Sequence, residues 1–313
     1  MPSQVNDNTI APLIFLVGAT GQTGKLILKE FDADPEGVRV RIGLRSRAEV
    51  ERLRAEGRDA VHFDLDDPRT FGAALAGVDR LYLLTGYTIA MVTQSKTLVD
   101  AARKAGVSHI VNQGVFAEWD CTDPHFSWFN MVERYIEASG IAWTHLHPNV
   151  FMEYMIASSS PKDGAFSVFW GESRVGWVAL RDVAAVAAKV LREGPQKHAG
   201  RDYWMSTEAL SGPQVAAVLS EELGREIRCD VRPAAEFEAL FQSGALQVES
   251  WYAKGAVDFC VQVEDGRMGY IGSVRDEIPH LLGRPATTLR AWAAENRTRL
   301  LGFADANPVA NVA

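Results

Sequence analysis

Short apolar runs alternate with amphipathic stretches along the first half of the chain. The runs have the length and composition of buried β-strands, and they occupy residues 13–17, 38–44, 60–63, 81–84, 109–111 and 141–146. Between them, apolar residues recur every three or four positions, as on one face of a helix; Met91, Leu98 and Ala105 share such a face, which ends at Gly106. Strand, helix and strand in repeated order predict a doubly wound parallel sheet with helices on both faces, which is an α/β fold of the Rossmann type. Ligands of such sheets bind at the carboxyl ends of the strands.

The second half of the chain is less regular. We expect a helix at 182–192, a strand at 203–205, and two helices at 214–223 and 234–240 that flank a short strand near 227–231. Residues 1–150 and 177–208 would form the dinucleotide-binding Rossmann domain, and residues 151–176 and 209–302 would form a smaller, discontinuous, helix-rich substrate lobe. Residues 303–313 have little apolar surface to bury and are expected to be a flexible tail.

Composition and charge narrow the class of protein. The 313 residues are 47% hydrophobic and 23% charged, which is typical of globular proteins and argues against wholesale disorder. The net charge of -8 argues against a general nucleic-acid binder, because neutralising phosphates requires a basic surface. No apolar run approaches the roughly 18 residues of a membrane span. The sequence therefore predicts a protein with no nucleic-acid and no membrane partner.

The cysteines and the N-terminal segment indicate the compartment. Cys121, Cys229 and Cys260 are an odd, scattered set without the spacing of metal ligands, so no metal site is expected and a reducing environment suits the chain. The first 11 residues are polar and lack the basic and apolar regions of a secretory signal. We expect a soluble, cytoplasmic protein.

The most informative segment is GATGQTG at 18–24, between the first strand and a helical stretch at 25–31. A tight turn from strand to helix needs residues without a Cβ, and a diphosphate needs close approach to backbone N–H groups at a helix N-terminus. In this context the pattern predicts a dinucleotide-binding loop, although a purely structural glycine turn is the alternative. The expected contacts come from Gly18, Thr20, Gly21, Gln22, Thr23 and Gly24.

Cofactor choice is read about 20 residues further on, at the end of the second strand. An NAD-preferring protein usually has Asp or Glu there to hold the ribose hydroxyls, whereas this strand ends in Leu44-Arg45-Ser46-Arg47. Arg45 and Arg47 offer guanidinium groups for a 2′-phosphate, so the sequence favours NADP(H) over NAD(H). The alternative is that both arginines are simply solvated charges.

Four motifs resemble the NmrA-like branch of the atypical short-chain dehydrogenases/reductases, which includes quinone reductases, dye reductases and redox-sensing regulators. They are GATGQTG at 18–24, FDLDD at 63–67, HPNVFME at 147–153 and GRPATTL at 283–289, and together they extend over most of residues 13–300. The first motif is shared by many dinucleotide binders, and the third and fourth are more particular to this branch.

The resemblance implies roles for further residues. Asp64 and Leu65 would flank the adenine ring, Thr85 and Gly86 would line the cofactor, and Gln113 and Gly114 would lie near the nicotinamide ribose. Asn149, Val150 and Phe151 would border the nicotinamide, with core packing as the alternative for Val150 and Phe151. Glu153 is expected to pair with a cation or to cap a helix, with no catalytic role.

The chain departs from the family at the proton donor. Ordinary short-chain dehydrogenases have a Tyr followed four residues later by a Lys that lowers the pKa of the phenol. Here Tyr135, Tyr154 and Tyr203 are followed at that spacing by Ser or Thr, and the segment 125–134 contains no Lys, which some relatives carry in the corresponding helix. His125 is the first candidate for a general acid or substrate anchor, because histidine titrates near neutral pH, and Tyr154 is the second.

Aromatic residues gather in segments expected at strand ends or in the lobe. Their placement suits a flat, apolar or aromatic ligand, although any one of them can instead fill the core. The residues are Tyr87, Phe116, Trp119, His125, Trp128, Phe151, Tyr154, Trp170 and Trp177.

Three functions are open. The first is an NADPH-dependent reductase (an oxidoreductase) that transfers a hydride to a small conjugated or aromatic acceptor, such as a quinone, dye, enone or imine, which needs little acid assistance. The second is a non-catalytic, NADP(H)-sensing regulator that acts through a protein partner, and a cofactor-retaining isomerase or lyase is a weaker third option. The oligomeric state is left open, with a homodimer among the options.

Overall fold

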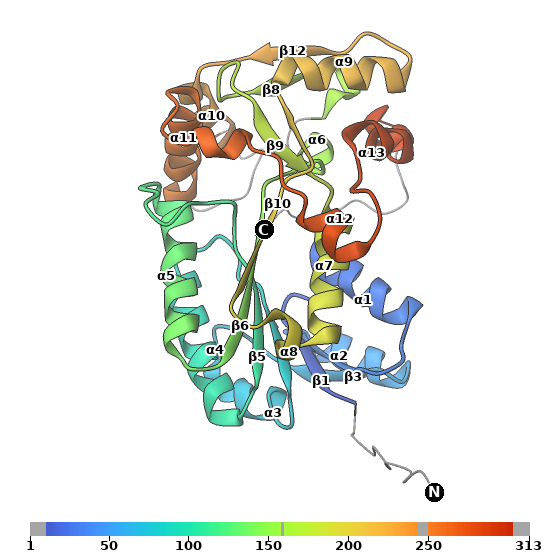
Figure 1. Cartoon of the computed structure of the whole chain (residues 1–313), viewed down its shortest axis with the longest axis vertical. Coiled ribbons are helices and arrows are strands. Elements are labelled where there is room, and N and C mark those ends of the chain that lie inside the picture. Colours follow the sequence, from blue (N-terminus) through green and yellow to red (C-terminus); the bar gives the residue numbers. More distant parts are fainter. Residues whose placement is uncertain (1–10, 158–159, 243–249, 303–313) are drawn as a thin grey trace, which may run out of the picture.

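A seven-stranded parallel sheet forms the centre of the lower part of the molecule in Figure 1. The computed structural model describes residues 11–157, 160–242 and 250–302. From one edge to the other, the strands are β10 (Arg201–Met205), β6 (Ala142–Pro148), β5 (His109–Gln113), β4 (Arg80–Leu83), β1 (Leu13–Leu16), β2 (Arg39–Leu44) and β3 (Asp59–His62). The chain order reverses between β1 and β4, and ligands of doubly wound sheets bind at this reversal.

Helices cover both faces of the sheet because successive strand residues point to opposite sides. On β1, Ile14 and Leu16 belong to the core beneath one group of helices, whereas Leu13 and Phe15 belong to the core beneath the other. The first group is α1 (Gln22–Ala33), α2 (Arg47–Ala55) and α7 (Leu180–Glu193), with α8 (Pro195–His198) after it. The second group is α3 (Phe71–Ala74), α4 (Met91–Ala105) and α5 (Pro124–Ala138), and the 3-10 turn η1 (Pro68–Thr70) precedes α3.

Smaller sheets and the C-terminal helices form the upper part (Figure 1). One sheet joins β7 (Val150–Phe151), β9 (Val175–Val178) and β11 (Glu208–Leu210), and the other joins β8 (Ala165–Val168) and β12 (Arg228–Val231). Around them lie α6 (Tyr154–Ala157), η2 (Pro161–Asp163), α9 (Gly212–Leu223), α10 (Ala234–Gln242), α11 (Ser250–Glu264), η3 (Gly269–Gly272), α12 (Glu277–Leu282), α13 (Leu289–Glu295) and α14 (Arg297–Leu300).

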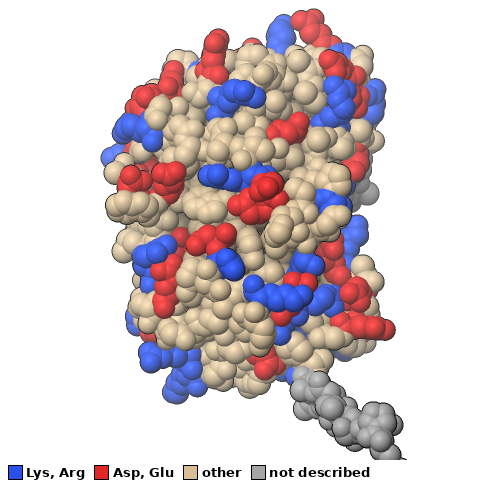
Figure 2. Space-filling view, in the orientation of Figure 1, with Lys and Arg blue, Asp and Glu red and all other residues tan. Residues whose placement is uncertain are grey.

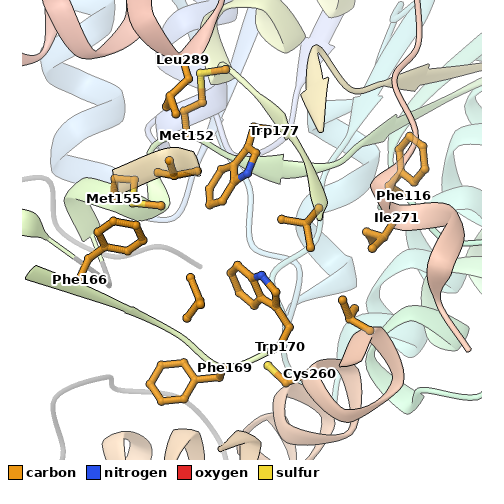
Figure 3. Close-up of a cluster of buried hydrophobic side chains, with 14 of the residues drawn as sticks. Phe116, Met152, Met155, Phe166, Phe169, Trp170, Trp177, Cys260, Ile271 and Leu289 are labelled. Carbon is orange, nitrogen blue, oxygen red and sulfur yellow. The ribbon is translucent and has the colours of Figure 1, made fainter. Parts of the chain in front are cut away.

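A third buried core holds the upper part together. Trp170 and Trp177 lie in the middle of the cluster in Figure 3, surrounded by side chains such as Met152, Phe169 and Leu289. These residues come from segments far apart in the sequence, so the core joins the middle of the chain to its C-terminal helices.

The fold class expected from the sequence is confirmed. The six strands expected in the first half are present, each with bounds within one or two residues of the prediction, and the helix ending at Gly106 is α4. The expected division into a Rossmann domain and a substrate lobe, with boundaries at 150, 177 and 208, stays a prediction. The strand β9 extends across the boundary at 177 and pairs within the three-stranded sheet. The expected tail at 303–313 lies outside the described residues.

The surface visible in Figure 2 carries Lys and Arg interspersed with Asp and Glu, without a broad basic field on this face. Within the described ranges, no helix has both the length and the apolar character needed to cross a bilayer. In the same ranges, no three His, Cys, Asp or Glu residues are grouped as metal ligands would be.

Candidate functional site

The turn between β1 and α1 depends on its glycines. Gly18 has a φ of +71°, in the left-handed region that favours glycine. At Gly24 a Cβ would lie 2.2 Å from the carbonyl oxygen of Gly18 and 2.6 Å from the Cα of Ala19, so a side chain there would overlap the backbone. Only a glycine lets the first turn of α1 lie this close to the end of β1.

The N-terminus of α1 has the features of an anion site. Its N-cap residue, Gly21, provides no side-chain hydrogen bond, and the first turn contains no acidic residue. The first N–H groups of a helix lack intrahelical partners and carry partial positive charge. Gly18, Thr20 and Gly21 are exposed, whereas Thr23 is buried beneath the turn. We call the turn at 18–24 and the first turn of α1 the glycine cradle. The glycine cradle therefore fits a diphosphate group, which would be held by backbone amides.

The end of β2 carries two arginines without acidic partners. Arg45 and Arg47 are both exposed, and neither forms an ion pair within the described part of the chain. By contrast, Arg52 on α2 pairs with Glu56 at 2.7 Å. Ser46, between the two arginines, caps α2 by accepting a hydrogen bond from the Glu49 N–H. Both guanidinium groups are thus available to an external anion.

The segment after β3 is a fixed turn. Asp64 Oδ1 accepts a hydrogen bond from the Asp66 N–H at 3.1 Å, and the Asp64 N–H donates to Thr70 Oγ1. Leu65 packs against the core beneath α3. A hollow of about 570 Å³ lies between this segment and α2, and Arg47 is among its lining residues.

The segments after β4 and β5 reach the same edge of the sheet. Thr85 is buried and lies 3.5 Å from Ser95 Oγ. Gln113 is also buried, and its Oε1 accepts a hydrogen bond from the Tyr82 hydroxyl. The amide oxygen of Gln113 is therefore engaged by the protein itself, while Gly86 and Gly114 contribute only backbone.

The motif at 147–153 is bound into the fold through its polar side chains. Asn149 Nδ2 donates to the Ile271 carbonyl at 2.9 Å, and its Oδ1 accepts from the Val150 N–H. Phe151 packs against the core of the lower part. Glu153 accepts hydrogen bonds from the Leu180 N–H, at the start of α7, and from the Trp292 indole. The expected helix-capping role of Glu153 is confirmed.

The motif at 283–289 fastens the C-terminal helices to α7. Asp182 is fully buried, and its two oxygens accept hydrogen bonds from Arg284 and from the Thr287 N–H. Arg181 also donates to the Thr287 hydroxyl at 2.9 Å. This motif therefore orients the upper part relative to α7, which packs against α1.

The expected aromatic wall is only partly available to a ligand. Phe116, Trp170 and Trp177 are buried in the core of the upper part, so the packing alternative holds for them, and Trp119 is 84% exposed. Facing apolar elements exclude water, and an aromatic residue between them becomes core whatever its position near a strand end. Tyr154 is partly buried beside Trp170, with ring centroids 6.1 Å apart.

The aromatic face of α11 was not predicted from the sequence. It meets α5 and the segment after β4: Trp251 lies against Trp128 at 4.5 Å between ring centroids, and Tyr252 lies against Tyr87 at 5.4 Å. The apolar positions 252, 256, 259, 260 and 263 have helical spacing and could have revealed this face. His125 is the second residue of α5, and its side chain lies outside the described part of the structure.

A cluster of three polar side chains, Glu133, His147 and Asp202, lies between α5 and the edge of the sheet. His147 Nε2 is 2.9 Å from Asp202 Oδ1, and Nδ1 is 3.6 Å from Glu133 Oε1. Burial alone would lower the pKa of His147, but the hydrogen bond to Asp202 and the charge of Glu133 raise it above its usual value. Burial raises the pKa of Glu133 to about 7, although His147 opposes the shift. Burial lowers the pKa of the neighbouring His145 to about 3.

The family model described as "NmrA-like family" matches residues 11–253. Among curated proteins, the chain is similar to an NAD(P)H azoreductase of Xenophilus azovorans, with 31% identity over 90% of this chain and 96% of that one. Among solved structures, it is similar to the Citrobacter triphenylmethane reductase complexed with NADP(H), with a TM-score of 0.78 and 23% identity over 91% of this chain and 99% of that one.

Two further structures have the same fold. The NADPH complex of the Escherichia coli quinone oxidoreductase gives a TM-score of 0.78 at 24% identity, over 90% of this chain and 99% of that one. The negative transcriptional regulator NmrA gives a TM-score of 0.71 at 19% identity, over 91% and 95%. At these identities the structural likenesses establish the fold alone.

Proposed function

The chain belongs to the NmrA-like family, and on that premise we propose that it is an NAD(P)H-dependent reductase of a small conjugated or aromatic acceptor, with NADP(H) preferred. The observation that carries the proposal is the glycine cradle at the uncapped N-terminus of α1, which fits a diphosphate. The azoreductase, quinone oxidoreductase and dye reductase among its relatives support the reaction class.

The chain's own residues would bind and orient the cofactor. The amides of the first turn of α1 would hold the diphosphate, and Arg45 and Arg47 would hold the 2′-phosphate. The reduced nicotinamide, when bound, supplies the hydride. The proposed cofactor contacts are Gly18, Thr20, Gly21, Gln22, Thr23, Gly24, Arg45, Arg47, Asp64, Leu65, Thr85, Gly86, Gln113, Gly114, Asn149 and Phe151.

The acceptor class follows from the missing Tyr–Lys pair. A quinone or an extended conjugated cation accepts hydride without a strong acid, because the added charge is delocalised or cancelled. Positioning and exclusion of water then suffice. His125 and Tyr154 stay the proposed contacts of the acceptor. The aromatic contacts of Tyr87 and Trp128 with α11 place an apolar surface next to the segment after β4.

The test is oxidation of NADPH by a panel of quinones, azo dyes, enones and imines, followed by absorbance of the reduced nicotinamide. Steady oxidation with at least one acceptor is expected. The regulator NmrA shares the fold, so a non-catalytic NADP(H)-sensing function is the second candidate. Tight binding of NADP⁺ or NADPH without turnover of any acceptor would favour that candidate and contradict the reductase.

A further inference from the structure

Glu133 of α5 is a buried acid beside the backbone expected to line the cofactor. Its side chain is 2% exposed, and its Oε1 has no hydrogen-bond partner in the described part of the chain. That oxygen occupies the space next to Gly114, where a Cβ would lie 2.5 Å from it. A buried carboxyl oxygen without a hydrogen bond is costly, so its position against the end of β5 requires an explanation.

His147 and Asp202 lie between this acid and solvent. His147 is held in place by the Val115 carbonyl, 3.0 Å from its Nδ1, and by stacking on Trp204 at 4.2 Å between ring centroids. Its other nitrogen faces Asp202, whose side chain is 39% exposed at the edge strand β10. The three groups thus lead from the surface to the carboxyl end of β5.

The charges around Glu133 come from three elements. His147 faces it from β6 and Asp202 acts on it from β10, while Arg134 and Glu137 are its neighbours on α5. With Asp202 ionised and His147 protonated, a neutral Glu133 leaves the trio without net charge. Ionisation of Glu133 adds one buried negative charge, which is favoured when positive charge arrives nearby.

The oxidised nicotinamide ring is a cation and the reduced ring is neutral. We propose that Glu133, His147 and Asp202 form a proton-storing trio, in which Glu133 is a carboxylic acid while the reduced cofactor is bound and a carboxylate while the oxidised cofactor is bound. Ionisation breaks the O–H bond of Glu133, and the proton is released to solvent, while His147 stays protonated and Asp202 stays ionised. The inference rests on the proposed cofactor site. It makes Glu133 a positioning residue that acts through its charge.

The experiment is calorimetric titration of the full chain with NADP⁺ and with NADPH. Each titration is repeated near pH 7 in two buffers of different ionisation enthalpy, which gives the number of protons released on binding. NADP⁺ should release protons and NADPH should not. For a pKa shift of one unit, the affinity for NADP⁺ should rise about fivefold from about pH 6 to about pH 8.

Two variants identify the group that loses the proton. Glu133→Gln should abolish the release and flatten the pH dependence. Glu137→Gln, one helical turn further along α5 and beside His145, should retain both. Because Glu133→Gln can fail to fold, the wild-type protein is also examined by difference infrared spectroscopy. A protonated-carboxyl band should disappear when NADP⁺ binds.

Equal proton release with NADP⁺ and NADPH, or release that persists in folded Glu133→Gln, would overturn the trio. An infrared spectrum in which no carboxyl band changes would do the same. These titrations need no turnover, so a protein that binds both nucleotides but oxidises NADPH with no acceptor would lose the proposed reductase function and keep this inference. Absence of binding to either nucleotide would overturn both.

Discussion

Removing a guanidinium group at the end of β2 should weaken binding of NADPH and leave binding of NADH unchanged. Arg45 and Arg47 are exposed and have no acidic partner among the described residues, so Arg45→Ala and Arg47→Ala should change the free energy of unfolding by less than about 0.5 kcal/mol. A hydrogen bond to a charged group contributes about 1.5 to 3 kcal/mol. Because both side chains are exposed, the lower value applies, which corresponds to roughly a tenfold increase in the Kd for NADPH.

The assay is titration of each nucleotide into the wild type, the two variants and Arg52→Ala. Arg52 is the matched control, since it lies on the adjoining helix and is already paired with Glu49 and Glu56. We expect its removal to leave both Kd values within about twofold of the wild type. If the affinities for NADPH and NADH fell together, or if Arg52→Ala weakened NADPH as much as the other variants, these arginines would not be readers of the 2′-phosphate.

Three further predictions test the glycine cradle, the link to the C-terminal helices and the buried His145. Gly24→Ala places a Cβ 2.2 Å from a backbone oxygen and should abolish nucleotide binding in calorimetry. Gly72→Ala is the control, because no atom lies within 4 Å of its new Cβ, and it should bind nucleotide normally. Nucleotide binding by Gly24→Ala would contradict the role of the glycine cradle. Asp182→Ala leaves Arg284 without its buried acceptor and should lower the free energy of unfolding in urea by about 2 to 4 kcal/mol, and a loss below about 1 kcal/mol would refute that role. His145 has its pKa lowered to about 3 by burial, so its contribution to stability is lost as the pH falls from about 6.5 towards 3, by about 2 kcal/mol at about pH 5. His145→Phe should reduce the acid sensitivity of thermal unfolding, and an unchanged pH profile would show that another group causes it.

The central sheet and the glycine cradle could be predicted because their signals are local. Each strand is a short apolar run, and the turn at 18–24 combines its glycines with the strand before it and the helix after it. Gly24 illustrates the point, since the contacts that exclude a side chain come from Gly18 and Ala19, only a few residues away. Arg45 and Arg47 have no acidic partner in the part of the chain that the structure describes, which agrees with the interpretation made from the sequence, but the preference for NADP(H) stays a proposal.

The trio around Glu133 could not be predicted because it depends on which strands become neighbours. Glu133, His147 and Asp202 come from α5, β6 and β10, and β10 pairs with β6 across an insertion that builds much of the upper part. Likewise, the sequence could not separate aromatic core from pocket lining. Trp170 and Trp177 are buried because distant segments close over them, and that closure leaves no periodic signal at either residue.

The trio and the missing Tyr–Lys pair both concern how charge would be balanced when hydride leaves the cofactor. Reduction by hydride leaves a cationic ring on the cofactor and an anion or a neutral product at the acceptor, so a reductase without a dedicated phenol must still balance charge. Here Phe129 of α5 packs edge-to-face on Tyr87, and an acid lies one turn further along the helix at Glu133. An apolar surface near the proposed acceptor contacts would favour acceptors that delocalise charge, and an ionisable carboxyl beside Gly114 would compensate the positive ring of a bound oxidised cofactor. If the chain is the proposed reductase, the two features together would account for hydride transfer without the usual proton donor. The pH dependence of NADP⁺ binding is the measurement that links them.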